Sequence, residues 1–387
     1  MIKYDFNPSR TLLTNFSKEV ISPTLSKMAE FLKTVPLSHR QTFSDVFSDW
    51  MVKELLQCKP ELLVAHIHRV YSELPILADR YWPSYLLADI KIPANISTYK
   101  CQTKDEKAGI DVILTCAVDY LKHRITVGLV FIPSLLDLLV NAKTYSAKKS
   151  ALQRVYNVAY SDIRATKKHL EIFPVWINTF EDVFSYSSLS SLMGLAIVQE
   201  WNINVCLYCN NESIQTRGDK IKLRADLDHF YPQTKFPFLA VTLSNLVPAG
   251  SFCNQGYKKS HHMLDYEHPF VLGVNDARLF HIIYPTGGRV ESNNYSVAVF
   301  SQAGKLDKNI EGFEIKHLYS TQEHIKTWVS IAYEAVEVIR GLNYAAHTPT
   351  LLKALVDSSK SPHLELAKKF KADSINQFAE MELVTYP

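Results

Sequence analysis

The stretches CLYCNN (206–211), LRADLDHFYP (223–232) and LSNLVPAGSFCNQGYKKS (243–260) decide how this chain is interpreted. They contain a Cys-x-x-Cys knuckle, an adjacent acid and imidazole, and an asparagine followed by a Cys-Asn pair. The residues concerned are, in chain order, Cys206, Cys209, Asp228, His229, Asn245, Cys253 and Asn254. Thiolates, a carboxylate beside an imidazole and amide oxygens within one short span suit a metal-assisted attack on a phosphodiester.

Each part of that chemistry has a candidate residue. Phosphodiester hydrolysis needs a base that activates water and a cation that stabilises charge on the phosphate and the leaving oxygen. His229 is the candidate base because imidazole titrates near neutral pH, while Asp228 and Asn254 offer oxygen ligands for Mg²⁺ or Mn²⁺. Asn245 is expected to hydrogen bond the backbone and to pin the loop that carries His229. Neighbouring strand residues point to opposite faces, so Asp228 and His229 meet only at a turn or across a hairpin.

Three basic residues are candidate contacts to nucleic acid. Lys258 and Lys259 follow the Cys-Asn pair, where a helix would aim cations at phosphates, and Arg224 precedes the Asp-His pair. His268 stands in a His-Pro dipeptide. It is either a supporting or metal-binding group or a plain turn histidine, and the sequence leaves both interpretations open.

Composition limits the class of protein. The chain has 387 residues, enough for two or three domains, and 47% of them are hydrophobic, enough for sizeable cores. A net charge of +3 excludes a polybasic nucleic-acid coat, so any basic surface must be local. Six cysteines and a beginning without a signal-peptide pattern indicate the cytoplasm, where paired cysteines suggest metal rather than disulfides. The longest apolar region, 110–140, is interrupted by charges, so we expect no membrane span.

The patterning predicts an α+β protein. Residues 1–185 form a mainly helical N-terminal domain, which would recognise, regulate or bind a partner. Residues 186–275 form an irregular, metal-organised module. Residues 276–387 supply further elements: strands on either side of a Gly-Gly-Arg turn at 287–289, and a helix with an apolar stripe from Ile325 to Ile339. Ser320 and Glu323 suggest a capping box for that helix.

The central motifs resemble HNH endonucleases, whose ββα-metal fold carries an Asp-His pair on a hairpin and the last ligand on a helix. The similarity extends to HNH proteins of bacterial anti-phage defence, such as Septu nuclease subunits and related retron effectors. It covers about 184–339 and rests on INVCLYCN, DLDHFYP, FPFLAVTLSNLVP, the Cys-Asn pair with its downstream lysines, the His-Pro dipeptide and EGFEIKHLYSTQEHI. The resemblance implies that His229 is the general base, that Asp228 and Asn254 hold the catalytic cation, and that Asn245 is the motif's structural asparagine.

One position departs from this pattern. The resemblance implies a zinc site closed by two Cys-x-x-Cys pairs, but Gly250 stands where the first cysteine of the second pair would be. Structural zinc sites take four ligands. Either His261, His262 or a distant cysteine completes the set with Cys206, Cys209 and Cys253, or the three cysteines are merely packed.

The sequence therefore favours a metal-dependent HNH endonuclease acting on nucleic acid, with double-stranded DNA as the expected substrate and anti-phage defence as the expected role. Free nuclease activity would harm its host, so we expect restraint by a partner such as an ATPase subunit or by the N-terminal domain. Two alternatives stay open. One is a nucleic-acid-binding or scaffold subunit with an inactive HNH fold, and the other is an RNA-cleaving, toxin-like effector.

Overall fold

The computed structural model describes residues 1–160, 171–214, 216, 224–273, 278–285, 290–291, 294–301, 304–341, 348–356 and 360–380. Over these residues the chain is mostly helical, with two small sheets of two antiparallel strands each. The expected α+β class is confirmed at this level. The Gly-Gly-Arg turn at 287–289 lies outside the described residues.

The first half is helical, as its sequence periodicity predicts. Prolines separate consecutive helices, because proline lacks the N–H that a helix interior needs: Pro36 precedes α3, and Pro75 begins α6. A capping box of Thr103 and Glu106 begins α7. The helices are α1 (Arg10–Phe16), α2 (Ser22–Thr34), α3 (Leu37–Val46), α4 (Asp49–Gln57), α5 (Leu63–Glu73), α6 (Pro75–Tyr81), α7 (Lys104–Arg124), α8 (Phe131–Val140) and α9 (Tyr145–Tyr160).

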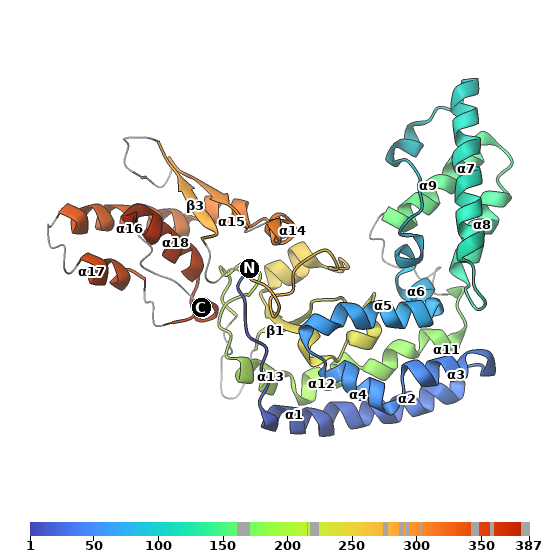
Figure 1. The fold of residues 1–387 in the computed structure, drawn as a ribbon, viewed down its shortest axis with the longest axis horizontal. Helices are drawn as coiled ribbons and strands as arrows, with labels where there is room; N and C mark the ends of the chain where they lie inside the picture. Colours follow the sequence, from blue (N-terminus) through green and yellow to red (C-terminus); the bar gives the residue numbers. More distant parts are fainter. Residues whose placement is uncertain are drawn as a thin grey trace.

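These helices form two groups in space. Helices α1 to α4 run along the lower edge of the molecule, whereas α7, α8 and α9 rise from it as a separate arm (Figure 1). Asp79 of α6 helps to fix the arm, because its carboxylate accepts the backbone N–H groups of Val130, Phe131 and Ile132 at 2.6, 2.8 and 2.9 Å. Those N–H groups begin α8, where a helix leaves its donors unsatisfied.

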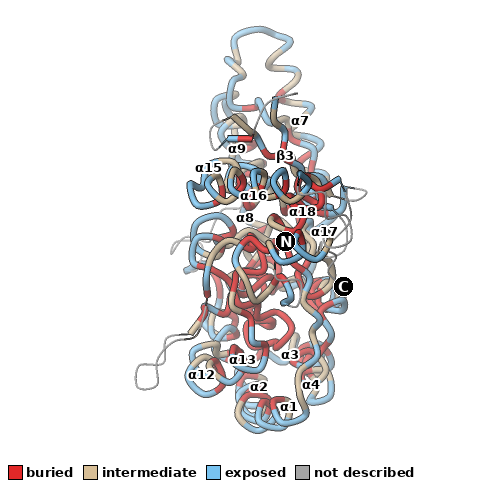
Figure 2. Tube along the Cα trace, turned by 90° about the vertical axis from the view of Figure 1, so that its left-hand side faces the viewer, coloured by how far each residue is buried: buried red, intermediate tan, exposed pale blue. Residues whose placement is uncertain are grey.

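The centre of the molecule is built from short elements. Helices α11 (Val175–Asn178), α12 (Tyr186–Leu192) and α13 (Gly194–Trp201) lead into the knuckle. Strand β1 (Asp226–His229) pairs antiparallel with β2 (Leu246–Ala249), and a short helical segment, η8 (Phe252–Lys258), follows β2. Residues 235–250 are all buried. In Figure 2 the buried trace gathers in the middle of the molecule. The central hairpin is therefore deep in the fold.

The C-terminal part contains the second sheet and a further group of helices. The predicted strands on either side of the Gly-Gly-Arg segment are present and pair with each other. The helix predicted from its apolar stripe is present as well, and it buries Ile325, Val329 and Val336. The elements are β3 (Phe280–Ile283), β4 (Ser296–Val299), α14 (Asp307–Gly312), α15 (Ile315–Thr321), α16 (Glu323–Gly341), α17 (Thr348–Ala354) and α18 (Lys368–Ala379).

The predicted capping box before α16 is wrong. Ser320 lies inside α15, and its hydroxyl donates to the carbonyl of Lys316 in the preceding turn. This bond within the helix competes with capping. Helix α16 nevertheless begins at Glu323, after a break at Gln322.

Distant parts of the chain converge on the knuckle at 206–209. The N–H of Ile2 donates to the carbonyl of Leu207 at 2.9 Å, and the hydroxyl of Tyr319 in α15 donates to that of Cys209 at 2.9 Å. Asn210 takes a left-handed backbone conformation and donates through its amide to the carbonyl of Pro362 at 2.7 Å. The knuckle is thus held from both ends of the chain. Among the described residues, none of the helices has the length and apolar character needed to cross a bilayer.

Candidate active site and metal cluster

The hairpin places the Asp-His pair at the wall of one cavity. Asp228 faces Val247 in the register of β1 and β2, and His229, the last residue of β1, faces Leu246. Both line a cavity of about 330 Å³ together with Asn254 of η8. Because β1 ends at His229, the two neighbours reach the same space despite the alternation of side chains along a strand. We call this space the Asp-His cavity.

His229 is held in one orientation. Its Nε2 lies 2.8 Å from the carbonyl oxygen of Ala240, and the ring of Tyr186 meets it edge to face at 4.4 Å between centroids. A carbonyl oxygen only accepts, so Nε2 carries the proton and Nδ1 keeps the lone pair. Burial lowers the pKa of His229 to about 4, partly offset by the bond to Ala240. The imidazole is therefore neutral at neutral pH and can accept a proton.

Asn245 is fully buried and fixes the loop after His229. Its amide oxygen accepts the N–H of Tyr231 at 2.8 Å, and its amide nitrogen donates to the carbonyls of Tyr231 and Leu239 at 3.0 and 3.1 Å. These are backbone hydrogen bonds of the kind expected from the sequence. They close the segment that also carries the Ala240 carbonyl, the acceptor for His229.

Asp228 is buried, and both of its oxygens are engaged. Oδ2 accepts from the hydroxyl of Tyr208 at 2.6 Å, and Oδ1 accepts from the ammonium of Lys258 at 3.0 Å. The side chains of Lys258 and Asp228 are only 1% and 4% exposed. The expectation that Lys258 meets a phosphate from the surface does not fit this position, because the ammonium points inward to a carboxylate.

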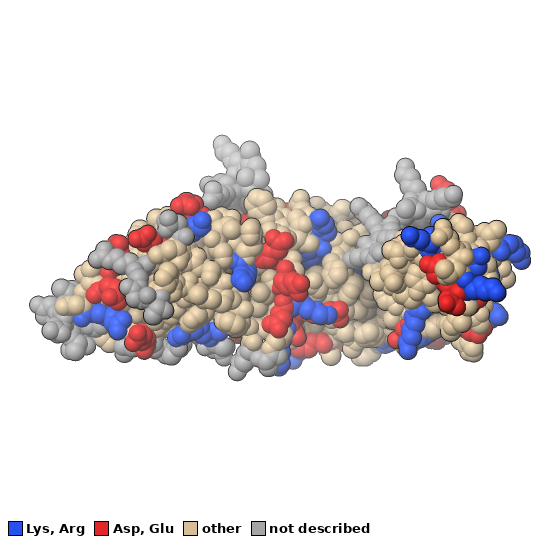
Figure 3. Space-filling view, turned by 90° about the horizontal axis from the view of Figure 1, so that it is seen from above, with Lys and Arg blue, Asp and Glu red and all other residues tan. Residues whose placement is uncertain are grey.

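The other basic candidates stay within reach of solvent. Lys259 is exposed. Arg224 is half-buried and lines the Asp-His cavity, and its guanidinium donates to the hydroxyl of Ser190 at 2.6 Å. On the face seen in Figure 3, lysines and arginines are scattered among acidic side chains, without one continuous basic surface. On this face a contact to nucleic acid would be local, as the net charge suggests.

His268 lies apart from this cavity, whose lining does not include it. It is buried against Phe230 and Phe270, at 4.3 and 5.1 Å between ring centroids, and its Nδ1 accepts the N–H of Phe270. Burial lowers its pKa to about 3, so the ring is neutral. Of the two interpretations left open by the sequence, packing in a turn fits this position, and through Phe230 it supports the residue after His229.

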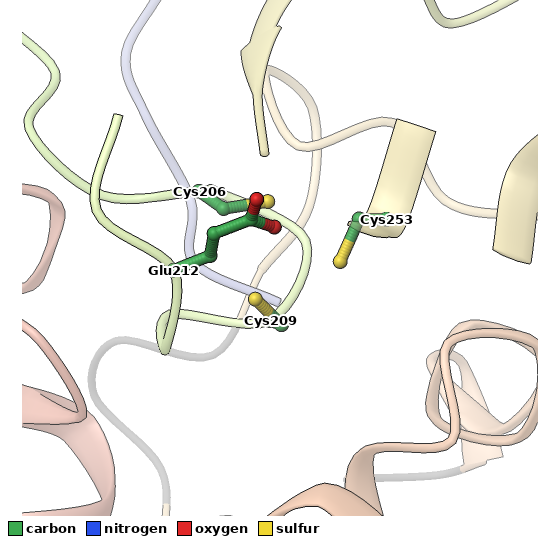
Figure 4. A group of neighbouring side chains, drawn as sticks. All are labelled: Cys206, Cys209, Glu212 and Cys253. Atoms are coloured by element: carbon green, nitrogen blue, oxygen red, sulfur yellow. The ribbon is translucent and has the colours of Figure 1, made fainter. Parts of the chain in front are cut away.

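A second group of side chains lies beside the hairpin (Figure 4). The sulfur atoms of Cys206, Cys209 and Cys253 and a carboxylate oxygen of Glu212 all lie within 4.8 Å of one another. The three cysteines are buried, and Glu212 is half-buried. We call these four residues the thiolate cluster, and it can hold a metal ion. The fourth donor is thus a carboxylate three residues after the knuckle, in place of the histidines considered from the sequence.

Gly250 explains how Glu212 enters the cluster. A Cβ atom at position 250 would lie 1.9 Å from Oε2 of Glu212. No side chain can occupy that space together with the carboxylate, since real Cβ atoms essentially never come within 3.0 Å of another group. The Glu212 carboxylate therefore occupies the space that the absence of a side chain at Gly250 leaves open.

The knuckle presents its sulfurs through backbone hydrogen bonds. The N–H of Asn211 points to Sγ of Cys209 at 3.4 Å, and the N–H of Cys206 donates to the Glu212 carbonyl at 2.9 Å. Burial raises the pKa of the Cys206 thiol, but hydrogen bonds from Cys209, Cys253 and the Gly250 backbone outweigh it and hold this pKa well below its usual range. The same hydrogen bonds to Cys206 raise the pKa of Cys209 and of Cys253. Cysteine ligands bind metal as thiolates, so one thiolate is favoured without a cation, and a bound metal ion would displace the protons of the other two thiols.

Three residues of the two sites were missed by the sequence analysis. Glu212 had a usable signal, namely an acid just after a knuckle that lacks its fourth cysteine. Tyr186 and Tyr208 had none, because a tyrosine at helical or knuckle spacing is usually a packing residue. Tyr208 also joins the sites, since it lies between Cys206 and Cys209 and bonds to Asp228.

Comparisons of the chain with known protein families, with curated proteins and with solved structures found no match.

Proposed function

We propose that this chain is a metal-dependent endonuclease of the HNH type, which hydrolyses phosphodiester bonds of nucleic acid. The observation that carries the proposal is the Asp-His cavity, where a neutral imidazole, a carboxylate and an amide line one space. Support also comes from the order of elements, strand, strand and helical segment, with the Asp-His pair on the first strand and Asn254 on the last element.

The chemistry follows from the side chains. With its proton on Nε2 toward Ala240, His229 takes a proton from water at Nδ1. Tyr186 and the Ala240 carbonyl keep the ring from turning, and Asn245 keeps that carbonyl in place. Arg224 lies at the cavity wall, where a guanidinium suits a phosphate oxygen.

Mg²⁺ or Mn²⁺ fits the donors of the cavity, because both cations prefer oxygen ligands. The carboxylate of Asp228 and the amide oxygen of Asn254 would hold it. Each carboxylate oxygen has two lone pairs, so the bonds to Tyr208 and Lys258 leave acceptor capacity. When bound, the cation supplies charge stabilisation for the phosphate and the leaving oxygen.

For the thiolate cluster we propose structural Zn²⁺. Three thiolates and one carboxylate provide the four ligands that closed zinc sites use. The ion would tie the knuckle to the start of η8 and so hold Asn254 in position beside Cys253.

The substrate and the setting follow from the resemblance alone: double-stranded DNA, a role in anti-phage defence, and restraint by a partner such as an ATPase subunit. One observation favours the second candidate, a binding subunit without cleavage. The Asp228 carboxylate is already neutralised by Lys258, so this candidate predicts nucleic-acid binding that no divalent cation changes.

The test is a cleavage assay with supercoiled plasmid, single-stranded DNA and RNA, each with and without Mg²⁺ or Mn²⁺. The matched pair of variants is His229→Ala and His281→Ala, since His281 is an exposed histidine of β3. Cation-dependent cleavage that is lost only in His229→Ala supports the proposal, and the substrate that is cut separates DNA from RNA. Nucleic-acid binding without cleavage, unchanged in His229→Ala, would support the binding subunit instead.

A further inference from the structure

Lys258 makes an unusual contact for a lysine beside a cation site. Its ammonium lies 3.0 Å from Oδ1 of Asp228, and the two side chains are 1% and 4% exposed. The second oxygen of the carboxylate accepts from the Tyr208 hydroxyl. Buried charges persist when they are paired, because removing one partner leaves the other charge uncompensated. Lys258 therefore compensates Asp228 within this fold.

A divalent cation bound at Asp228 would neutralise the same carboxylate that Lys258 already neutralises. Magnesium binds carboxylate oxygens at about 2.0–2.1 Å, whereas the ammonium of Lys258 already lies 3.0 Å from one of these oxygens. An ammonium and a divalent cation would then lie within a few ångströms of each other in a poorly solvated place. Their repulsion there is much stronger than at the surface.

We propose that Lys258 and the divalent cation compete for the carboxylate of Asp228. Lys258 is then a positioning residue that holds Asp228 neutralised in the absence of the cation and keeps the affinity of the Asp-His cavity for it low. The cation binds as the ammonium gives up its contact with Oδ1. This inference rests on the proposed function, because it takes Asp228 as a cation ligand.

The chain offers a matched pair for comparison. Lys308 and Asp265 form an ion pair of similar length, 2.8 Å, but their side chains are 58% and 57% exposed. Water screens such a pair, and exposed pairs contribute little. Lys308→Met thus removes the same kind of contact but leaves no buried charge without a partner. It also leaves the Asp-His cavity unchanged.

The experiment measures cation binding directly, with Mn²⁺ as the probe. Wild type, Lys258→Met, Lys308→Met, Asp228→Asn and the double variant Lys258→Met/Asp228→Asn are compared by thermal melting and by calorimetric titration. Without Mn²⁺, Lys258→Met should melt several degrees below wild type, because Asp228 stays buried without its partner. Mn²⁺ should restore that loss, and its Kd should fall at least about tenfold. Lys308→Met should match wild type in both measurements.

The double variant isolates the pair. If Lys258 acts through Asp228, Lys258→Met should give no gain in Mn²⁺ affinity once Asp228 is neutral. Should Lys258→Met fold poorly, Lys258→Gln, which removes the charge but keeps a donor, is expected to show the same tighter binding.

The outcomes separate this inference from the proposed function. Equal or weaker Mn²⁺ binding in Lys258→Met, with binding lost in Asp228→Asn, would overturn the competition and leave the cation site standing. Absence of Mn²⁺ binding in wild type and in both Lys258 variants would overturn the competition and the cation site together.

Discussion

The thiolate cluster and the Asp-His cavity meet in one helical segment, yet they are built in opposite ways. Cys253 of η8 belongs to the cluster, and its neighbour Asn254 lines the cavity. The cluster is closed, with four donor atoms within 4.8 Å of one another. The cavity is open over about 330 Å³ and has oxygen and nitrogen donors. A closed set of four ligands suits a metal that stabilises the fold, whereas a site that reacts needs an open position.

The two sites also differ in what neutralises them. In the cluster, the sulfurs hydrogen bond to one another and to the backbone. In the cavity, an amino-acid cation, Lys258, neutralises the carboxylate. Two neighbouring residues of one short segment thus lie in chemically different surroundings, one among thiols and one beside a carboxylate and an imidazole. Substitutions at positions 253 and 254 should therefore have unlike effects.

The largest expected difference is between Cys253→Ser and Asn254→Ala. The first removes a ligand of the proposed structural zinc, so the free energy of unfolding should fall by about 3–5 kcal/mol and zinc should no longer co-purify. The second removes a ligand of the proposed catalytic cation, so cation-dependent cleavage should fall roughly 100-fold while the melting temperature stays near that of wild type. Zinc content by mass spectrometry, melting curves and nicking rates check both.

Similar losses of zinc and stability in Cys253→Ser and Asn254→Ala would contradict this separation of the two sites. If Asn254→Ala loses zinc and stability as Cys253→Ser does, the two sites are one structural unit. If the unchanged protein contains no zinc and Cys253→Ser is as stable as it is, the cluster is a group of packed cysteines.

A smaller effect on stability and zinc retention is expected from substitutions at Gly250, beside the Glu212 carboxylate. Gly250→Ala should displace the Glu212 carboxylate, because the added Cβ would lie 1.9 Å from Oε2. The carboxylate is the end of a flexible side chain and can turn away. We therefore expect a loss of less than about 1 kcal/mol in stability without metal, with weaker zinc retention against a chelator. Gly250→Cys combined with Glu212→Ala should recover retention, because four thiolates then surround the ion. Unchanged zinc retention in Glu212→Ala alone would show that Glu212 is not a ligand.

The smallest expected effect is that of pH on cleavage. His229 acts as a base in its neutral form, and burial lowers its pKa to about 4. The neutral form therefore persists as the pH falls from 7.5 to 5.5, and cleavage at saturating cation should change less than about twofold. A histidine with an ordinary pKa of about 6.5 would lose about tenfold over that range. A rate profile with an apparent pKa near 6.5 would contradict the buried, oriented imidazole.

Local sequence patterns predicted much of this structure. Motif spacing singled out the knuckle, the Asp-His pair and Cys253-Asn254, and the structure places these residues in the thiolate cluster and at the Asp-His cavity. Periodicity identified the N-terminal helices, α16, and the strands β3 and β4. The cavity itself shows why the order of motifs was informative, since Asp228, His229 and Asn254 do line one space.

The rest depends on packing that no local pattern records. Lys258 turns inward because Asp228 is buried beneath η8, a relation that only the folded hairpin creates. Tyr186 reaches His229 from α12, more than forty residues earlier in the chain. Glu212 enters the cluster only because Gly250 leaves room. In each case a residue type common on surfaces or in cores acquired its role from a neighbour distant in sequence.

The most direct measurement is nicking of supercoiled plasmid with Mn²⁺ by wild type, His229→Ala and His281→Ala, with the fold of each checked by melting. The account predicts cation-dependent nicking that His281→Ala retains and that His229→Ala lowers by about 10²–10⁴, the usual contribution of a positioned base. Equal nicking by wild type and His229→Ala would contradict the account, because the imidazole of the Asp-His cavity would then take no part in cleavage.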